Sequence, residues 1–171
     1  MKSVAPATVS WHEANQRYLT AALAIVRSRL EPNEALRGTQ FDPELELHEA
    51  ARAMPATPAL ETLCAAFELT SFEREILLLC TGVELDAGFA KLMTDGGAPR
   101  SVQPTFGLAL ATLPEAHWSA LTPVAPLRRW QLIEAEPGDT LAERRLRIDE
   151  RVLHYLTGIE YLDDRLSGIV E

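Results

Sequence analysis

Apolar residues recur at helical spacing through the first two-thirds of the chain. Between Ser10 and Leu30 they form one wide stripe, and Ser10 followed by Glu13 matches a capping box at its start. The segment 72–86, FEREILLLCTGVELD, is apolar on almost every side, which predicts a central core helix. The same spacing predicts shorter helices at 43–53, 58–67, 87–94 and 104–113, and a short helical stretch at 115–121.

Helix-start signals support this division. The side chain of an N-cap residue accepts a hydrogen bond from a free N–H group of the first turn, and a proline in that turn has no N–H to satisfy. In a capping box, a threonine and the glutamate three residues later each accept one backbone N–H group. These signals occur at Asp42-Pro43, at Thr57-Pro58 and, as a capping box, at Thr70 with Glu73.

The last third of the chain changes character. Prolines at 114, 123 and 126 interrupt the helical pattern, and Trp130, Leu132 and Ile133 suggest a strand. The turn residues 137–139 are Pro-Gly-Asp, so residues 129–136 and 144–149 are predicted to pair as a hairpin. A helix at 150–156 follows and is closed by Gly158.

Several helices, one hairpin and a further helix is the element order of a winged-helix unit, in which the hairpin is the wing. The predicted fold is therefore mainly α, a helical bundle plus a winged-helix domain with a small β-hairpin. We expect four parts: a disordered tail at 1–9, an N-terminal helical segment at 10–56, the winged-helix-like domain at 57–165 and a terminal linker at 166–171.

Composition and charge narrow the function classes. The chain has 171 residues, 47% hydrophobic and 24% charged, as in ordinary soluble globular proteins. Its net charge of −9 works against binding a polyphosphate backbone, so nucleic acid is not a favoured partner. Apolar runs fall short of the roughly 18 residues that a membrane helix needs, and the first residues lack the apolar stretch of a secretory signal. We expect a cytoplasmic protein without a membrane partner.

Candidate catalytic and metal-binding groups are sparse. The four histidines show no two-histidine metal spacing, and Cys64 and Cys80 lie at apolar helical positions typical of buried free thiols. Ser119, His117 and Asp149 could form a catalytic set on paper, but no nucleophile motif supports it and chance is the better interpretation. Trp118 and His154 are expected to be packed interior or boundary residues. We expect no catalytic, cofactor or metal site in this chain.

The predicted wing carries the one concentration of arginine. Six arginines and six carboxylates share residues 128–151, so the wing has no net positive potential. A solvated or ion-paired hairpin is the commoner interpretation, a protein-binding surface comes next, and a DNA contact is the least favoured. The helix at 104–113, taken by order as the one that would enter a DNA groove, offers only two threonine hydroxyls for reading bases. The candidate partner-binding surface comprises Arg128, Arg129, Arg144, Arg145 and Arg147.

Four segments in this order, FEREILLLCTGVELD, PTFGLAL, LTPVAPLRRWQLIE and LRIDERVLHYLTG, resemble the winged-helix region that precedes the ATPase core in certain bacterial AAA+ proteins. These include AAA+ proteins associated with contractile injection systems. The resemblance covers roughly residues 70–165. The chain departs from the parent family because no glycine begins a Walker A loop, G-x-x-x-x-G-K-[ST], so ATP hydrolysis cannot reside here.

The resemblance implies a non-catalytic adaptor or assembly domain. ATP and Mg²⁺ would bind only in a downstream core beyond Glu171, and a hexamer would form only through that core. The implied partners are that core and other proteins, with a looser link to contractile injection components. The alternative is a winged-helix DNA-binding transcriptional regulator, and a small enzyme of unrecognised type is a third possibility. Whether residues 1–56 pack on the winged part stays open.

Overall fold

The structure of the chain is a computed structural model that describes residues 8–31, 41–93 and 103–159. Most of the predicted tail at 1–9 and the whole predicted linker at 166–171 lie outside these residues. The elements are α1 (Trp11–Leu30), α2 (Pro43–Arg52), α3 (Ala59–Ala66), α4 (Ser71–Leu85), α5 (Ala87–Met93), α6 (Phe106–Thr112), the 3-10 helix η2 (Trp118–Leu121), α7 (Pro126–Arg129), β1 (Ile133–Ala135), β2 (Leu146–Ile148) and α8 (Glu150–Leu156). The fold is mainly helical with one small hairpin, as predicted.

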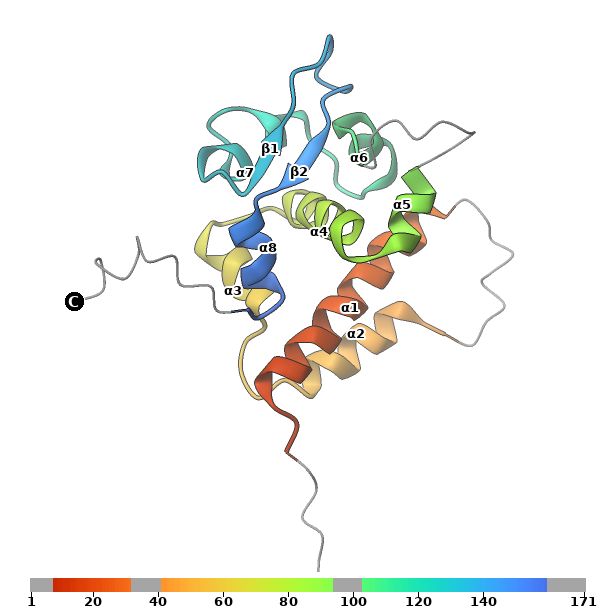
Figure 1. The fold of residues 1–171 in the computed structure, drawn as a ribbon, viewed down its shortest axis with the longest axis vertical. Coiled ribbons are helices and arrows are strands. Elements are labelled where there is room, and N and C mark those ends of the chain that lie inside the picture. Colours follow the sequence, from red (N-terminus) through yellow and green to blue (C-terminus); the bar gives the residue numbers. More distant parts are fainter. Residues whose placement is uncertain (1–7, 32–40, 94–102, 160–171) are drawn as a thin grey trace, which may run out of the picture.

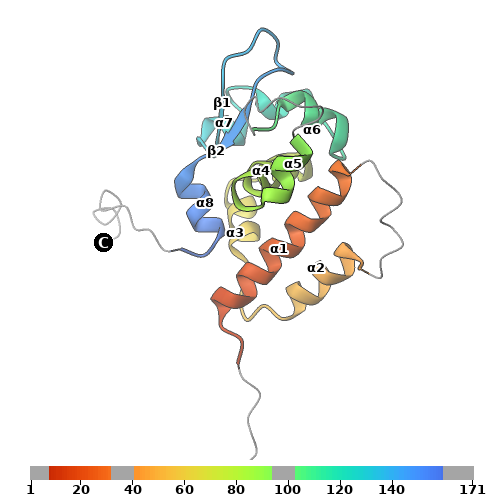
Figure 2. The ribbon, with the colours of Figure 1, turned by 45° about the vertical axis from the view of Figure 1, so that its right-hand side comes forward.

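Helix α4 is the centre of the molecule. Ile76, Leu77, Leu78 and Leu79 are all fully buried, so consecutive positions around the helix are covered by other elements. Figures 1 and 2 show α1 on one side of α4, α3 and α8 on another, and the hairpin above it. The predicted capping box at its start is present, with both the Thr70 and the Glu73 side chains bonded to backbone N–H groups. The predicted core helix is thereby confirmed.

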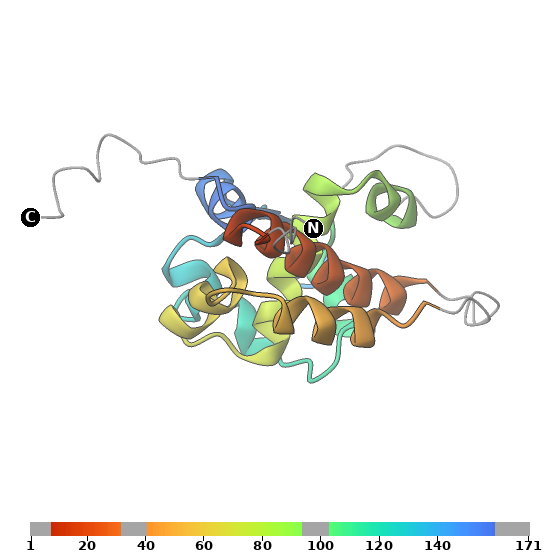
Figure 3. The same ribbon diagram turned by 90° about the horizontal axis from the view of Figure 1, so that it is seen from below.

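Helices α1 and α2 lie side by side as an N-terminal pair (Figure 3), and α1 also packs on α4. Their predicted starts are confirmed, because Ser10 accepts a hydrogen bond from the Glu13 N–H and Asp42 accepts from the first turn of α2. Buried residues before and after residue 56 belong to one hydrophobic core. The N-terminal helices therefore pack directly on the part of the chain predicted to be winged-helix-like.

A buried asparagine ties three elements together. The Asn15 side chain, 1% exposed, accepts the Ala59 N–H at 2.9 Å and donates to the Leu156 carbonyl at 3.1 Å. The predicted Thr57 cap of α3 is wrong, because Pro58 occupies the cap position and has no capping side chain. The start of α3 is completed by Asn15, a residue of α1 that lies 44 positions earlier in the chain.

The wing is a small sheet. Strands β1 and β2 are antiparallel, with Ile133 opposite Ile148 and Ala135 opposite Leu146. Thr105, just before α6, bridges to Arg145 on the other side of β2, so the order across the sheet is Thr105, β2, β1. The loop of the hairpin extends away from the helices, at the top of Figure 1.

The predicted first strand began too early. Trp130 is the C-cap of the four-residue helix α7 and β1 starts only at Ile133. Pro126 was interpreted as a break, but it stands in the first turn of α7, where its missing N–H costs nothing. Between helix and strand, Gln131 has a φ of 53°, and this left-handed residue turns the chain into the sheet.

The segment 115–121 is less helical and more exposed than predicted. Only the 3-10 helix η2 forms there. Trp118 is 64% exposed, so the prediction that it is a packed interior or boundary residue was wrong. Its ring contacts Phe106 edge-on, with 6.4 Å between centroids. Glu115, with a φ of 57°, takes a left-handed conformation directly after Pro114, which prevents α6 from continuing into a longer helix.

Replacing Asn15 with alanine should destabilise the protein by about 2–4 kcal/mol, because the Ala59 N–H and the Leu156 carbonyl would both lose their partner inside the fold. Urea denaturation followed by far-UV circular dichroism measures this change. Gln16→Ala, at an exposed neighbouring position of α1, is the matched control and should change the unfolding free energy by less than about 0.5 kcal/mol. Equal stability of the two variants would contradict the role given to Asn15.

Candidate interaction surface

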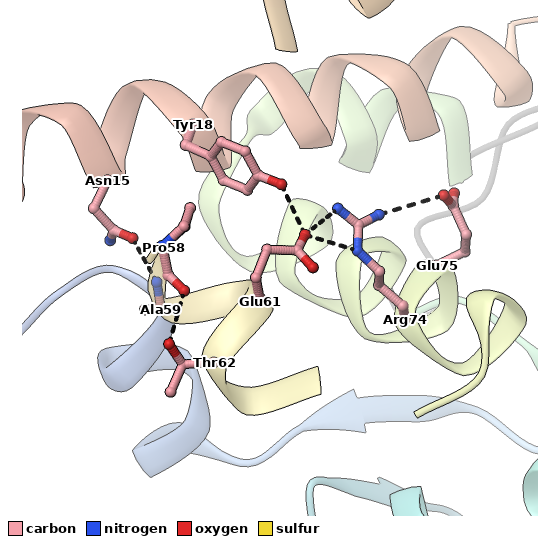
Figure 4. A network of polar contacts seen from close by, with 8 residues as sticks. All are labelled: Asn15, Tyr18, Pro58, Ala59, Glu61, Thr62, Arg74 and Glu75. Carbon is pink, nitrogen blue, oxygen red and sulfur yellow. Dashed lines mark hydrogen bonds and ion pairs between the residues drawn. The ribbon is translucent and has the colours of Figure 1, made fainter. Parts of the chain in front are cut away.

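A network of polar contacts joins α1, α3 and α4 (Figure 4). One oxygen of Glu61, Oε1, accepts the Tyr18 hydroxyl at 2.8 Å and two nitrogens of Arg74, at 3.1 and 2.7 Å. Arg74 also lies 3.8 Å from Glu75, and the same distance separates Arg29 of α1 from Glu75. The contacts of Glu61 with Tyr18 and Arg74, and that of Arg29 with Glu75, therefore connect α1, α3 and α4.

Burial raises the pKa values of a tyrosine and two cysteines in this part of the core. Burial first, and then the Glu61 hydrogen bond and charge, raise the pKa of Tyr18 to about 12. Burial and the same carboxylate raise the pKa of the Cys64 thiol to about 11. On α4, burial and the charge of Glu84 raise the pKa of Cys80 to about 12. Both thiols stay protonated at neutral pH and neither is disulfide-bonded, which confirms the prediction of buried free cysteines.

The Ser119, His117 and Asp149 set is not assembled. His117 does contact Ser119, with 2.8 Å between Nδ1 and Oγ, but its Nε2 faces the Thr70 hydroxyl at 2.8 Å. The Asp149 carboxylate is used elsewhere, as the N-cap of α8. The imidazole thus links the start of α4 to η2 and lacks the carboxylate that orients a catalytic base in a triad.

Two further features are absent from the described residues. Within 8–31, 41–93 and 103–159, no group of three or more His, Cys, Asp or Glu side chains could hold a metal ion. None of the helices in these ranges is both long and apolar enough to span a bilayer.

The five candidate arginines do different things. Arg129 and Arg147 are exposed, and Arg147 lies 3.8 Å from Glu84 of α4. Arg128 is half-buried and donates to the Leu121 carbonyl at 3.1 Å, which holds α7 against η2. Arg144 and Arg145 are partly covered where the chain pairs with the Thr105 segment. Their joint role as a partner-binding surface stays a prediction.

The helix at 104–113 is not the one that would read DNA. In a helix-turn-helix unit the second helix enters the major groove, and here α6 is followed by α7, which leads directly into the wing. Phe106 and Ala109 of α6 are fully buried, so α6 serves the core. The helix in the reading position, α7, has four residues and spans only about 6 Å.

An apolar groove opens beside α7, between α3 and α8. We call it the aromatic groove, and its volume is about 360 Å³. Trp130 and Tyr155 are 52% and 44% exposed, and Trp130 contacts Phe67 with 5.7 Å between ring centroids. The lining residues are Thr62, Leu63, Ala66, Phe67, Trp130, Gln131, Leu132, Asp149, Arg151, Val152 and Tyr155. The Arg129 guanidinium lies 5.1 Å from the Trp130 ring centre.

Two helix ends place the aromatic pair. Phe67 is the C-cap of α3 and Trp130 is the C-cap of α7. Each is followed by a left-handed residue, Glu68 with a φ of 52° and Gln131 with a φ of 53°. After each, a backbone N–H returns to a carbonyl five residues earlier, the pattern of a Schellman ending. The two rings therefore meet because two helix terminations converge.

Comparison with known families identifies the family of the chain. The family model described as "Winged helix domain, variant" matches residues 8–170. The chain belongs to this family. Neither the curated proteins nor the solved structures compared with the chain include a match. The family assignment therefore supports an interaction domain, for protein or for DNA, without naming a partner.

The match of this winged helix domain includes α1 and α2. Sequence reasoning found Arg129 but missed Phe67, Trp130 and Tyr155 as one surface. Trp130 was assigned to a strand and the other two to ordinary helix faces. The three aromatic residues are separated by 63 and 25 positions, and no periodic pattern connects them.

Stability should decline as pH rises from 10 to 12, since an unfolded chain releases the phenol proton near pH 10 while folded Tyr18 keeps it until about pH 12. Tyr18→Phe removes that contribution together with one hydrogen bond. Wild type should be more stable than the variant by about 1 kcal/mol at pH 8. Because a pKa raised from 10 to about 12 removes roughly 2 kcal/mol of wild-type stability by pH 12, the difference should reach zero between pH 10 and 12 and then reverse in sign. Urea denaturation in reducing buffer at stepped pH measures it. A difference independent of pH would contradict the assignment.

Gln131→Gly should stabilise the fold by roughly 0.5–1 kcal/mol, because glycine adopts a φ of 53° without the steric cost that a Cβ imposes. Gln131→Ala keeps the Cβ and serves as the control, with no gain expected. Thermal unfolding of the two variants gives the comparison. If the alanine variant gained as much as glycine, the left-handed turn would not be the source of the effect.

Proposed function

We propose that this winged helix domain is a non-catalytic, protein-binding adaptor or assembly module that works with an AAA+ ATPase core. ATP and Mg²⁺ bind in that core and not in the residues of this chain. Its role is to hold a protein partner close to the ATP-driven motion. A hexamer, where one forms, depends on the core.

One observation carries the protein-binding part of the proposal. At the position where a nucleic-acid reader would present a recognition helix, this chain has the four-residue α7 and the exposed ring of Trp130. A four-residue helix offers about one turn, too little to follow a major groove. An exposed tryptophan beside an arginine is instead typical of protein interfaces, where both residue types are enriched.

Charge favours the same partner class. The wing carries Arg145 and Arg147 together with Glu134, Glu136 and Glu143. Arg147 is within 3.8 Å of Glu84, which weakens its attraction for a phosphate. With a net charge of −9 over the chain, the electrostatic term that drives non-specific DNA binding is unfavourable.

The AAA+ part rests on the resemblance. Its four segments fall on consecutive pieces of the fold: the first on α4, the second on Thr105 and α6, the third on α7 and β1, and the fourth on β2 and α8. They cover the elements that build the winged unit. The resemblance therefore concerns the arrangement of this unit and extends over most of its core.

The DNA-binding alternative is tested by fluorescence anisotropy of a labelled random-sequence duplex at 50 and 200 mM salt. A protein that neutralises several phosphates loses affinity steeply with salt, whereas we expect no binding at either concentration. Arg129→Ala and Arg147→Ala should leave that result unchanged. Tight binding with a steep salt slope would favour the transcriptional regulator over the adaptor.

The AAA+ assignment has its own test in the gene. We expect the coding sequence to continue past Glu171 and to encode a Walker A loop within about a hundred residues. The protein made from the whole gene should hydrolyse ATP, and the 171-residue chain alone should not. A gene without that loop would contradict the AAA+ role and leave the protein-binding role untouched.

A further inference from the structure

We infer that the aromatic groove binds one amphipathic helix of a partner protein, with apolar anchors on the face that enters the groove and acidic residues along its flank. The inference rests on the proposed protein-binding function and specifies the partner chemistry of that surface. It follows from the shape of the groove, from the side chains that line it and from the charges at its rim.

The walls of the groove suit a helix. α3 contributes Leu63 and Phe67 at its cap, and α8 contributes Val152 and Tyr155, in each case residues about one helical turn apart. Side chains spaced by a turn form ridges that accept the ridges of a third helix. The three-residue strand β1 offers far less to an added strand, because it provides few backbone pairing sites.

The residue types that line the groove are those found at the centre of protein–protein interfaces. Trp130 and Tyr155 remain about half-exposed, although burial of such rings is strongly favourable. Tryptophan, tyrosine and arginine are the residues that contribute most often to interface hot spots, and all three types meet in this groove. The two Schellman helix ends hold the apolar lining in place. Because this surface is already ordered before a partner binds, binding would cost little conformational entropy of the groove.

The charges at the groove favour an acidic partner, although the net charge of the whole chain is negative. Asp149, the one carboxylate in the lining, accepts two backbone N–H groups of α8 and the Arg151 guanidinium at 3.3 Å. Its charge is therefore largely satisfied within the protein. Arg129 is exposed and lies over the Trp130 ring, where it can meet a carboxylate of the partner. An acidic flank would place negative charge beside this guanidinium.

A second hollow, lined by other residues of α8 and by β2, has the opposite character. It is lined by Glu84, Glu134 and Glu150 as well as Arg147 and His154. An acidic helix would be repelled there, since like charges brought together cost free energy. The same acidic flank thus favours the aromatic groove and disfavours the neighbouring surface.

The test is a selection of 16-residue peptides displayed on yeast against the intact 171-residue protein. The library has a helical pattern of apolar anchors, with Asp, Glu, Lys, Arg or Gln allowed equally at every flanking position. We expect the enriched peptides to carry an excess of Asp and Glu on one flank. Enrichment of basic flanks, or no enrichment, would overturn the inference.

Variants locate the binding site of the enriched peptides. Trp130→Ala should weaken binding by about 30-fold, Tyr155→Ala by about 10-fold and Arg129→Gln by roughly three-fold, all measured by titration of purified peptide. Trp118→Ala removes another exposed tryptophan, outside the groove, and is the matched control, with unchanged affinity expected. Circular dichroism verifies that each variant is folded, which is expected because the three side chains are all exposed.

Alternative occupants of the groove, and binding at another site, would each give a different experimental result. Light scattering that shows a dimer, converted to a monomer by Trp130→Ala, would mean that a second copy fills the groove and would overturn the inference. Peptides that bind equally well to wild type and to Trp130→Ala would also overturn it while leaving the protein-binding function standing. Binding of duplex DNA, by contrast, would remove the proposed function itself.

Discussion

Helix α4 has no face that can be left to solvent, and the rest of the fold follows from that constraint. Leu77, Leu78 and Leu79 are consecutive and fully buried, so cover is needed around the whole circumference of the helix. No single neighbouring helix can supply it. Helix α1, the α3 and α8 pair and the wing lie on different sides of α4, and their buried residues belong with those of α4 to one hydrophobic core.

Polar contacts specify how these covering elements are placed. Asn15 joins α1 to the start of α3 and to the end of α8. One carboxylate oxygen of Glu61 accepts hydrogen bonds from both Tyr18 of α1 and Arg74 of α4. Apolar packing alone would tolerate some sliding of α1 along α4. Buried hydrogen bonds do not, since a shift would leave their donors and acceptors unpaired. These bonds make the N-terminal helices an integral part of the winged unit.

The wing and its preceding helix show how a shared fold can present a different surface. The order of Thr105, β2 and β1 in the sheet and the placement of α6 before α7 are those of a helix-turn-helix unit with a wing. The C-cap of the four-residue α7, Trp130, lies next to the C-cap of α3, Phe67. Both rings line the aromatic groove, and this supports the proposal of a protein partner.

The sequence by itself determined the longer helices, the caps at Ser10, Asp42 and Thr70, the buried cysteines and the presence of a hairpin, because these depend on neighbouring residues and on a regular period. Only the tertiary structure decided the cap of α3, the exposure of Trp118, the end of α7 and the aromatic groove. For the cap of α3 and for the aromatic groove, the deciding contact joins residues far apart in the chain. Asn15 reaches Ala59, and Phe67 meets Trp130. Local periodicity carries no information about which distant side chains will face each other, so such contacts arise only once the helices are packed.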